Sequence, residues 1–213
     1  MRIKPILFNT EMARAILDGR KTQTRRLIKP AALGLRYEDS APAIKPPVEP
    51  GDILWVRETW KQATTGTAGP GLIDLFLYKA DDPQDTTGMM VEERWHPSIH
   101  MPRRAARIFL EVKAIRAERL KDITEADVQA EGTDMDAWYE YDEWQHQVGD
   151  GCVSEGIPVK FETMRGFFGH TVWDTTMQSR EQYEKYGWDA NPWVWVIEFE
   201  RIDGGRKWIS SES

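Results

Sequence analysis

The sequence predicts an α+β fold in which a small, partly closed β-barrel carries peripheral helices. Several short segments have the period-two pattern of strands, few have helical periodicity, and strand-like segments stand close to both ends of the 213 residues. Hydrophobic residues make up 40% and charged residues 30%, the balance of a soluble globular protein. We therefore expect a single domain over residues 1–213, with a proline-rich loop at 30–50 and a helical or irregular insertion at about 133–190.

The first thirty residues predict a strand, a helix and a second strand. Residues 3–8, IKPILF, have strand character. The helix that follows begins at Asn9 or Thr10, which are both good capping residues, and ends at Gly19, because a left-handed residue commonly closes a helix. The segment TQTRRLI, residues 22–28, then predicts the second strand.

The middle of the chain predicts three further strands. Residues 50–60, PGDILWVRETW, predict a turn followed by an alternating strand. We expect residues 61–71 to form a flexible connection, because they are rich in glycine and threonine, and residues 72–80 to form a strand. Residues 104–120 contain enough β-branched and aromatic side chains for one long strand or for a bent pair.

A short helix is predicted at residues 122–132. Asp122 or Thr124 caps its beginning, and Gly132 closes it.

The segment NPWVWVIEFERI predicts a closing strand that is half-buried. Trp193 and Trp195 alternate with valines in this segment, so we expect both tryptophans to be core residues.

Several classes of protein are disfavoured by composition. The single cysteine, Cys152, excludes an internal disulfide and a cysteine-based zinc site, and its acidic, glycine-rich surroundings are not those of a reactive thiolate. No apolar run approaches the ~20 residues that cross a bilayer, and the first twelve residues have too short an apolar core for a signal peptide. We expect a cytoplasmic protein that does not associate with membranes.

The charge is unevenly distributed. A net charge of −7 argues against a protein that coats nucleic acid non-specifically, whereas local cationic clusters suit one bound anionic ligand. The first cluster can also simply complement the negative end of the first helix, which requires no function. The two clusters are Arg20, Lys21, Arg25 and Arg26, and Arg103, Arg104, Arg107, Lys113, Arg116 and Arg119.

Other candidate residues are weaker. Trp60 and Trp95 are less clearly core residues and can stack on a planar base. His96 and His100 have the spacing of a zinc helix, but a proline follows His96 directly and no glutamate lies between them, so we expect no metal site. The mixed pattern around Glu111 leaves its burial open, although a lone strand carboxylate usually faces solvent. No glycine-rich phosphate loop, nucleophile elbow or dinucleotide fingerprint occurs.

The segment GRKTQTRR, residues 19–26, resembles the signature of the ASCH domain, a PUA-like β-barrel family linked to RNA and nucleoside chemistry. The family pattern is glycine, any residue, lysine, two residues, glutamate, one residue, arginine, and Gly19, Lys21 and Arg26 match it. Thr24 stands where the family has glutamate, and in this respect the segment resembles the bacterial N4-acetylcytidine amidohydrolases. Over most of its length, the chain is similar to ASCH proteins carried by phages and prophages.

The resemblance implies three catalytic roles. That branch uses a threonine nucleophile, a lysine proton acceptor and a strand glutamate, which correspond to Thr24, Lys21 and Glu111 here. A threonine hydroxyl needs a base to take its proton, and a lysine can serve where burial or neighbouring cations lower its pKa. A bend after Gly19 can bring Lys21 and Thr24 together. The same three residues can equally form a buried polar network that recognises a base without cleaving it.

Our leading hypothesis is therefore an ASCH-type amidohydrolase that acts on an acylated pyrimidine nucleoside without a metal or organic cofactor. The alternatives are a non-catalytic module that binds RNA or a modified base, and a ribonuclease, although no metal cluster supports the latter. We expect a nucleoside or modified base as the partner, either free or within RNA, and no obligate protein partner. The residues expected to bind the substrate are Arg20, Arg26, Arg57, Trp60, Trp95 and Arg103.

Overall fold

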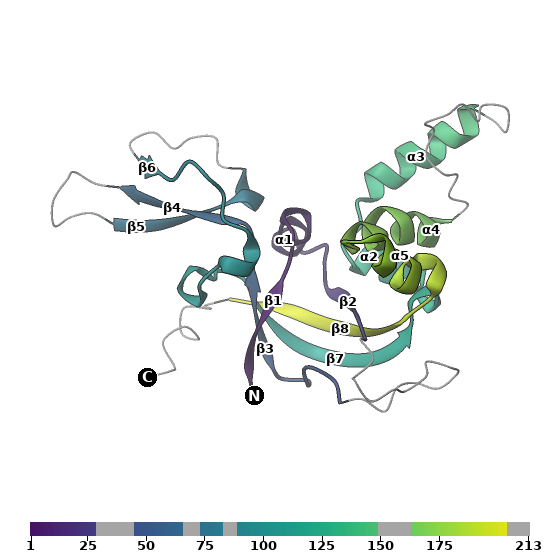
Figure 1. The fold of residues 1–213 in the computed structure, drawn as a ribbon, viewed down its shortest axis with the longest axis horizontal. Coiled ribbons are helices and arrows are strands. Elements are labelled where there is room, and N and C mark those ends of the chain that lie inside the picture. Colours follow the sequence, from purple (N-terminus) through teal and green to yellow (C-terminus); the bar gives the residue numbers. More distant parts are fainter. Residues whose placement is uncertain (29–44, 66–72, 83–88, 149–162, 204–213) are drawn as a thin grey trace. The chain divides into compact units, whose positions relative to one another are not determined.

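The computed structural model describes residues 1–28, 45–65, 73–82, 89–148 and 163–203. It confirms the α+β class, with two sheets and several helices (Figure 1). The larger sheet has five strands in the order β1-β3-β7-β8-β2, and the smaller has three in the order β5-β4-β6. The strands are β1 Ile3–Leu7, β2 Gln23–Leu27, β3 Ile53–Arg57, β4 Trp60–Thr65, β5 Ile73–Tyr78, β6 Met89–Val91, β7 Phe109–Arg119 and β8 Trp193–Ile202.

The strands around Leu54, Glu111 and Trp195 share one sheet, because β3, β7 and β8 are neighbours in the five-stranded sheet. β1 runs parallel to β3, with Ile3 opposite Ile53, and β3 runs antiparallel to β7, with Ile53 opposite Glu111. In the described part of the chain, β1 and β2 are the two edges of this sheet. The sheet is therefore open there and does not form a closed barrel.

The chain divides into two compact units, which are described separately. Unit 1 contains Met1–Thr22, Val48–Ala114 and Glu198–Ser213, and unit 2 contains Gln23–Pro47 and Ile115–Ile197. Each of the long strands β7 and β8 contributes residues to both units.

Helix α1, Thr10–Leu17, belongs to unit 1 and has the boundaries that the sequence predicts. The side chain of Asn9 accepts a hydrogen bond from the backbone N–H of Met12 and caps the helix. Gly19 has φ of +75°, the left-handed conformation expected after the helix end. The capping residues therefore fix both ends of α1.

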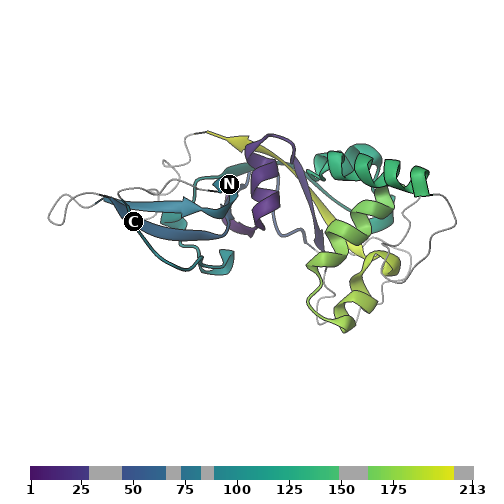
Figure 2. The same ribbon diagram turned by 90° about the horizontal axis from the view of Figure 1, so that it is seen from above.

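The prediction of a flexible connection at residues 61–71 is wrong for residues 61–65, which belong to a strand. Residues Trp60–Thr65 form β4, the central strand of the three-stranded sheet, which Figures 1 and 2 show beside β5. Ala63 pairs with Leu75 on one side and Val91 on the other and is 1% exposed. Pairing on both sides outweighs the weak strand propensity of this segment. Residues 66–72 lie outside the described residues.

Within residues 104–120, the segment Phe109–Arg119 forms one long strand, β7, and a short 3-10 turn precedes it. Residues 30–44 of the predicted proline-rich loop lie outside the described residues, and residues 45–50 form neither helix nor strand. Short 3-10 turns in unit 1 are η1 Lys79–Asp81, η2 Ser98–His100 and η3 Arg103–Ala105, and η4 Leu120–Asp122 lies in unit 2.

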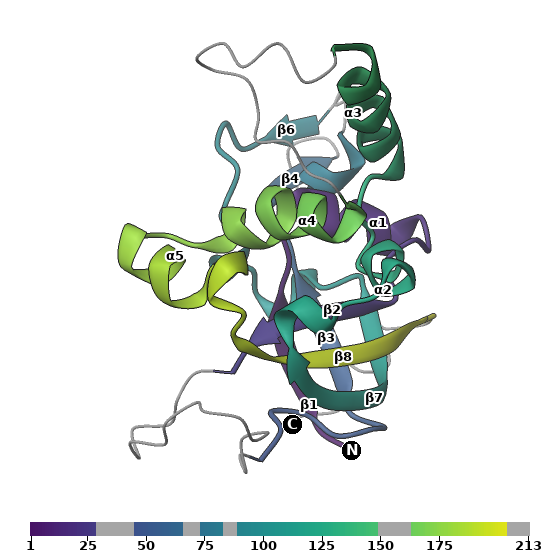
Figure 3. The same cartoon turned by 90° about the vertical axis from the view of Figure 1, so that its right-hand side faces the viewer.

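Unit 2 has helical structure where the insertion at 133–190 was predicted, although residues 149–162 lie outside the described residues. Helix α2, Glu125–Ala130, begins at Thr124 with a capping box that includes Asp127. Figures 1 and 3 show α2 beside α4. The other helices are α3 Met135–Val148, α4 Met164–Phe168, the π-helix η6 Gly169–Trp173, η7 Asp174–Thr176, α5 Arg180–Tyr186 and η8 Trp188–Ala190.

The core assignment of Trp193 and Trp195 is also corrected. Val194 and Val196 are fully buried in the core of unit 2, whereas the two tryptophans are half-buried on the other face of β8. The guanidinium of Arg119 lies 4.8 Å from the ring centroid of Trp193. At residues 193–196 the valine face of β8 is the buried one, whereas further along the strand Ile197 and Phe199, on the tryptophan face, are buried.

The longest helix in the described part of the chain, α3, has 14 residues. No described helix is both long and apolar enough to cross a bilayer.

Candidate functional site

Lys21 is buried in unit 1, immediately after the helix end at Gly19. It is 2% exposed, and its Nζ lies 5.7 Å from the ring centroid of Phe8. The ring of Phe8 packs in turn against Phe199, with 6.3 Å between centroids. The backbone N–H of Lys21 donates to the carbonyl of Ala15 at 2.9 Å. The ammonium therefore lies over an aromatic ring in the interior and is not an exposed helix-end charge.

The rest of the matched segment lies on β2 in unit 2. Thr24 is 1% exposed. The guanidinium of Arg25 is buried between Glu118, at 2.5 Å, and Glu131, at 3.1 Å. Burial lowers the pKa of Arg26, and the charge of Glu131 acts in the opposite direction. Both terminal nitrogens of Arg25 are therefore paired with carboxylates inside the protein, which is a structural role.

Glu111 lies on β7 in unit 1, at the surface. Its side chain is 37% exposed and accepts a hydrogen bond from Nζ of Lys113 at 2.7 Å. The same ammonium pairs with Glu200 of β8 at 3.0 Å. Glu111 and Glu200 thus share one cation on one face of the five-stranded sheet.

These contacts separate Glu111 from Lys21. Phe199 and Glu200 are successive residues of β8 and point to opposite faces of the sheet. Lys21 lies on the side of Phe199, and Glu111 lies on the side of Glu200. The structure does not bring the predicted acid to the predicted base, and Thr24 belongs to the other unit.

Three of the predicted binding residues, Arg20, Trp95 and Arg103, are at least partly exposed to solvent. Arg20 is about half exposed and pairs with Asp18 at 3.0 Å. Trp95 is half-buried, and the ammonium of Lys61 lies 4.5 Å from its ring centroid. Arg103 is half-buried in η3.

Trp60, at the start of β4, is not available as a stacking platform. It is 8% exposed, with the ring of His96 at 4.9 Å and that of Phe76 at 5.6 Å. Its backbone also pairs with that of His96 in both directions, at 3.2 and 2.7 Å. Because Trp60 is covered, the aromatic surface left for a ligand belongs to its half-exposed neighbours, His96 and Phe76.

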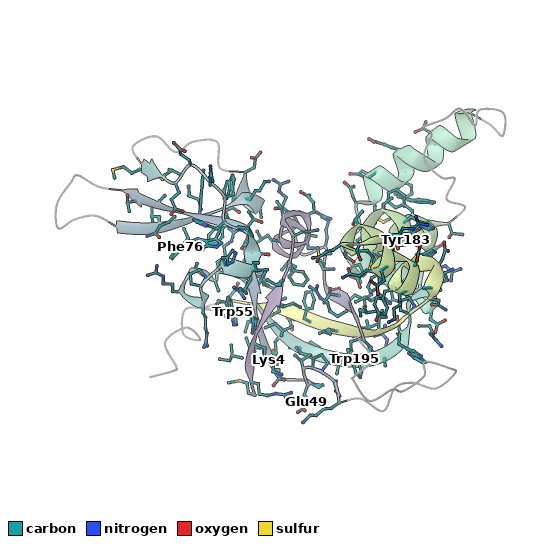
Figure 4. All side chains as sticks on the ribbon, viewed as in Figure 1. Lys4, Glu49, Trp55, Phe76, Tyr183 and Trp195 are labelled. Atoms are coloured by element: carbon teal, nitrogen blue, oxygen red, sulfur yellow. The ribbon has the colours of Figure 1, made fainter. Side chains whose placement is uncertain are left out.

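Arg57, the last residue of β3, contacts the same segment of chain as Trp60. Its Nη2 donates to the carbonyl of Ile99, and its guanidinium lies 5.5 Å from the ring centroid of Trp55. Figure 4 labels Trp55 on β3 and Phe76 on β5. Ile99 is 55% exposed, so the segment that contacts Arg57 lies at the surface.

Two buried donors distinguish this region. Among the described residues, neither Nε of Arg57 nor Nε1 of Trp60 has a hydrogen-bond acceptor, although both atoms are buried. The same holds for Nε of Arg103 in unit 1 and, in unit 2, for Nε of Arg25, Nε of Arg26, Oγ1 of Thr133 and Nε1 of Trp193. Arg57 and Trp60 are singled out because both also contact residues 96–101. We define the Trp60 site as Arg57, Trp60, Phe76 and residues 96–101.

Three of the six residues of the second cationic cluster are neutralised by carboxylates. Arg107 binds Glu58 at 2.9 and 3.0 Å and Asp81 at 2.6 Å, over the ring of Tyr78. Lys113 has its two glutamates, and Arg116 pairs with Glu118 at 3.0 Å. A run of cations in the sequence is therefore not, by itself, a free positive surface.

In the described parts of the chain, no three histidine, cysteine, aspartate or glutamate side chains form a group that can hold a metal ion. No protein-family model matches the sequence, and neither the curated proteins nor the solved structures include a significant match.

Sequence reasoning missed several neighbours of the Trp60 site. Phe76 and His96 had no assigned role, although Phe76 shares a face of β5 with Tyr78, which lies directly opposite Trp60 in the sheet. Glu58 was also missed as the buried partner of Arg107. The alternation of β5 could have identified Phe76, but no sequence signal places His96 against Trp60.

Proposed function

We propose that the chain is an ASCH-type domain with a PUA-like fold, and that it binds a pyrimidine nucleoside or modified base, free or within RNA, at the Trp60 site. The match of GRKTQTRR to the ASCH signature supports the family and the ligand class. The adjacency of β3, β7 and β8 in one sheet of an α+β fold is compatible with it.

The observation that carries the proposal is the pair of buried N–H donors, Nε of Arg57 and Nε1 of Trp60, which have no acceptor among the described residues. A buried donor left unsatisfied costs about 1–3 kcal/mol, so a ligand that supplies acceptors recovers this energy on binding. Both donors lie beside residues 96–101, where Ile99 is largely exposed.

A pyrimidine has the chemistry that this site requires. Cytosine presents the acceptors O2 and N3 on one edge, which suits two N–H donors, and its flat ring suits half-exposed aromatic neighbours. In this proposal Trp60 contributes its N–H group, while His96 and Phe76 provide the stacking surface.

The test is a titration of N4-acetylcytidine and cytidine into wild type and Trp60→Phe by isothermal titration calorimetry. This substitution keeps an aromatic ring and removes the donor together with the pyrrole part of the indole, and loss of one buried hydrogen bond, about 1.4 kcal/mol, weakens affinity about tenfold. Glu111→Gln is the control, because Glu111 lies in a surface ion pair and should leave affinity unchanged. If Glu111→Gln weakens binding while Trp60→Phe does not, the ligand binds elsewhere and this proposal is wrong.

Hydrolysis of the acyl group is the second candidate, and the burial of both Lys21 and Thr24 favours it. A threonine nucleophile and a lysine base need to be shielded from water, and these residues lie three positions apart in the chain. We expect such an enzyme to convert N4-acetylcytidine to cytidine and acetate. Thr24→Val and Lys21→Met should each reduce turnover, followed by chromatography, by at least about a hundredfold. Binding by the wild type without turnover would reject this candidate.

A further inference from the structure

The Trp60 site is surrounded by arginines that have no carboxylate partner. Within the described residues, Arg57 and Arg104 form no ion pair, and neither does Arg94, which lies two residues before His96. Elsewhere in the described chain, arginines commonly do have such partners, including Arg2, Arg14, Arg20, Arg25, Arg107, Arg116 and Arg180.

Arg104 is connected to Trp60 through Phe76. Its guanidinium lies 5.7 Å from the ring centroid of Phe76, which is 5.6 Å from the ring centroid of Trp60. Arg104 is itself exposed. An exposed guanidinium is thus held one aromatic ring away from the buried indole donor.

Three acidic side chains of this neighbourhood are already engaged. Glu58 and Asp81 both bind Arg107, and Glu92 accepts hydrogen bonds from the ring of His96 and from the backbone of Gln62. None of these three carboxylates pairs with Arg104. Arg104 therefore remains an exposed guanidinium without a carboxylate partner among the described residues.

We propose that the ligand of the Trp60 site carries a phosphate, and that Arg104 contacts this phosphate while Arg57 and Trp60 hold the base. The inference rests on the proposed function and restricts its ligand from a nucleoside to a pyrimidine nucleotide, either free or as part of an RNA strand. A guanidinium suits this role because it remains charged and can donate two parallel hydrogen bonds to a phosphate.

The test compares cytidine, cytidine 5′-monophosphate and a ten-residue oligocytidylate on the full chain, by calorimetry at two salt concentrations. We expect the monophosphate to bind at least about tenfold more tightly than cytidine, with an advantage that decreases as salt is added. Arg104→Gln should abolish this advantage and leave the affinity for cytidine unchanged. Arg180→Gln is the matched control, because Arg180 is 91% exposed on α5 in unit 2.

The possible outcomes separate this inference from the proposed function. The phosphate assignment is wrong if cytidine and its monophosphate bind with equal affinity, or if Arg104→Gln still binds the monophosphate more tightly than cytidine. Neither result contradicts the proposed base site. Trp60→Phe should weaken both ligands by the same factor, and its failure to do so overturns the base site itself. If the oligocytidylate binds more tightly than cytidine 5′-monophosphate, both inferences hold and RNA is the source of the phosphate. If it does not, both inferences still hold and the ligand is the free nucleotide.

Discussion

Glu58 is a buried carboxylate whose negative charge is balanced by a single arginine, Arg107. Its side chain is 1% exposed, and both of its oxygens accept hydrogen bonds from Arg107. Burial raises the pKa of Glu58, and the hydrogen bonds and charge of Arg107 oppose that increase. Arg107 has a second partner in Asp81, so the arginine depends less on Glu58 than Glu58 depends on the arginine.

We therefore predict that Arg107→Met destabilises the protein by about 3 kcal/mol, because it leaves the charge of Glu58 buried without a counter-charge. The double variant Arg107→Met with Glu58→Gln should recover part of that loss, since it removes the stranded charge. The free energy of unfolding, from urea denaturation of the two variants and wild type, provides the measurement. A cost below about 1 kcal/mol for Arg107→Met would show that Glu58 does not need this partner.

The sequence could indicate which residues are charged but not which charges meet. Arg25 was predicted as part of a cationic cluster, yet its partners Glu118 and Glu131 are 93 and 106 positions away. Glu111 was selected from the motif, and its contact with Lys113 depends on the strand exposing that face. Arg57 and Trp60 were named from the sequence as candidate binding residues, but their buried donors depend on residues 96–101, whose course no local pattern specifies.

Secondary-structure elements were predictable where capping residues or alternation mark them. The ends of α1 follow from Asn9 and Gly19, and the start of α2 follows from Thr124. β4 was missed because its pairing with two other strands is a tertiary effect, which outweighs the local composition. The burial of Trp193 and Trp195 was assigned incorrectly because period two fixes two faces of β8 but not which one is more buried at each point along the strand.

Gly169 and Gly19 have different reasons for being glycine, close packing at Gly169 and a left-handed backbone at Gly19. A Cβ added at Gly169, where the π-helix begins, would lie 2.1 Å from the indole of Trp188, too close for contact, whereas a Cβ at Gly19 would meet open space. We predict that Gly169→Ala costs at least about 2 kcal/mol through overpacking, and that Gly19→Ala costs about 1 kcal/mol because its φ of +75° strains any other residue.

Thermal unfolding by circular dichroism compares these two variants, with Gly51→Ala as a second left-handed glycine that has open space around it. Equal losses at Gly169 and Gly19 would contradict the steric explanation.

For the whole molecule, stability in acid should depend on one carboxylate in each unit. In unit 1, hydrogen bonds from the side chain of Arg2 lower the pKa of Asp52 to about 2, with further help from backbone N–H groups. In unit 2, burial acts to raise the pKa of Asp127, but its carboxylate accepts hydrogen bonds from the backbone and hydroxyl of Thr124 and from Gln23, which outweigh burial and lower the pKa to about 2.

Both carboxylates are stronger acids in the folded state than in the unfolded state, where the pKa is about 3.8. Their stabilising contribution is therefore complete above pH ~4 and is lost as the pH falls toward about 2. We predict that the free energy of unfolding decreases over this range, and that Asp52→Asn and Asp127→Asn each reduce the slope and lower stability at pH 7. Urea denaturation between pH 2 and 7 provides the measurement, with the exposed Asp18→Asn as control. An unchanged slope in either variant would show that its carboxylate does not govern the acid limb.

The contact between Phe8 and Phe199 has a consequence for the order in which the protein is made. These rings pack together in unit 1, and the backbone N–H of Phe199 also donates to the carbonyl of Thr22. Translation adds roughly 5–20 residues each second, so the ribosome reaches Phe199 about 10–40 s after Phe8. During that interval the segment containing Lys21 lacks a partner that later covers it. Folding of unit 1 therefore completes late in synthesis, and nascent chains stalled before Phe199 should be more sensitive to protease within residues 1–22 than the released protein.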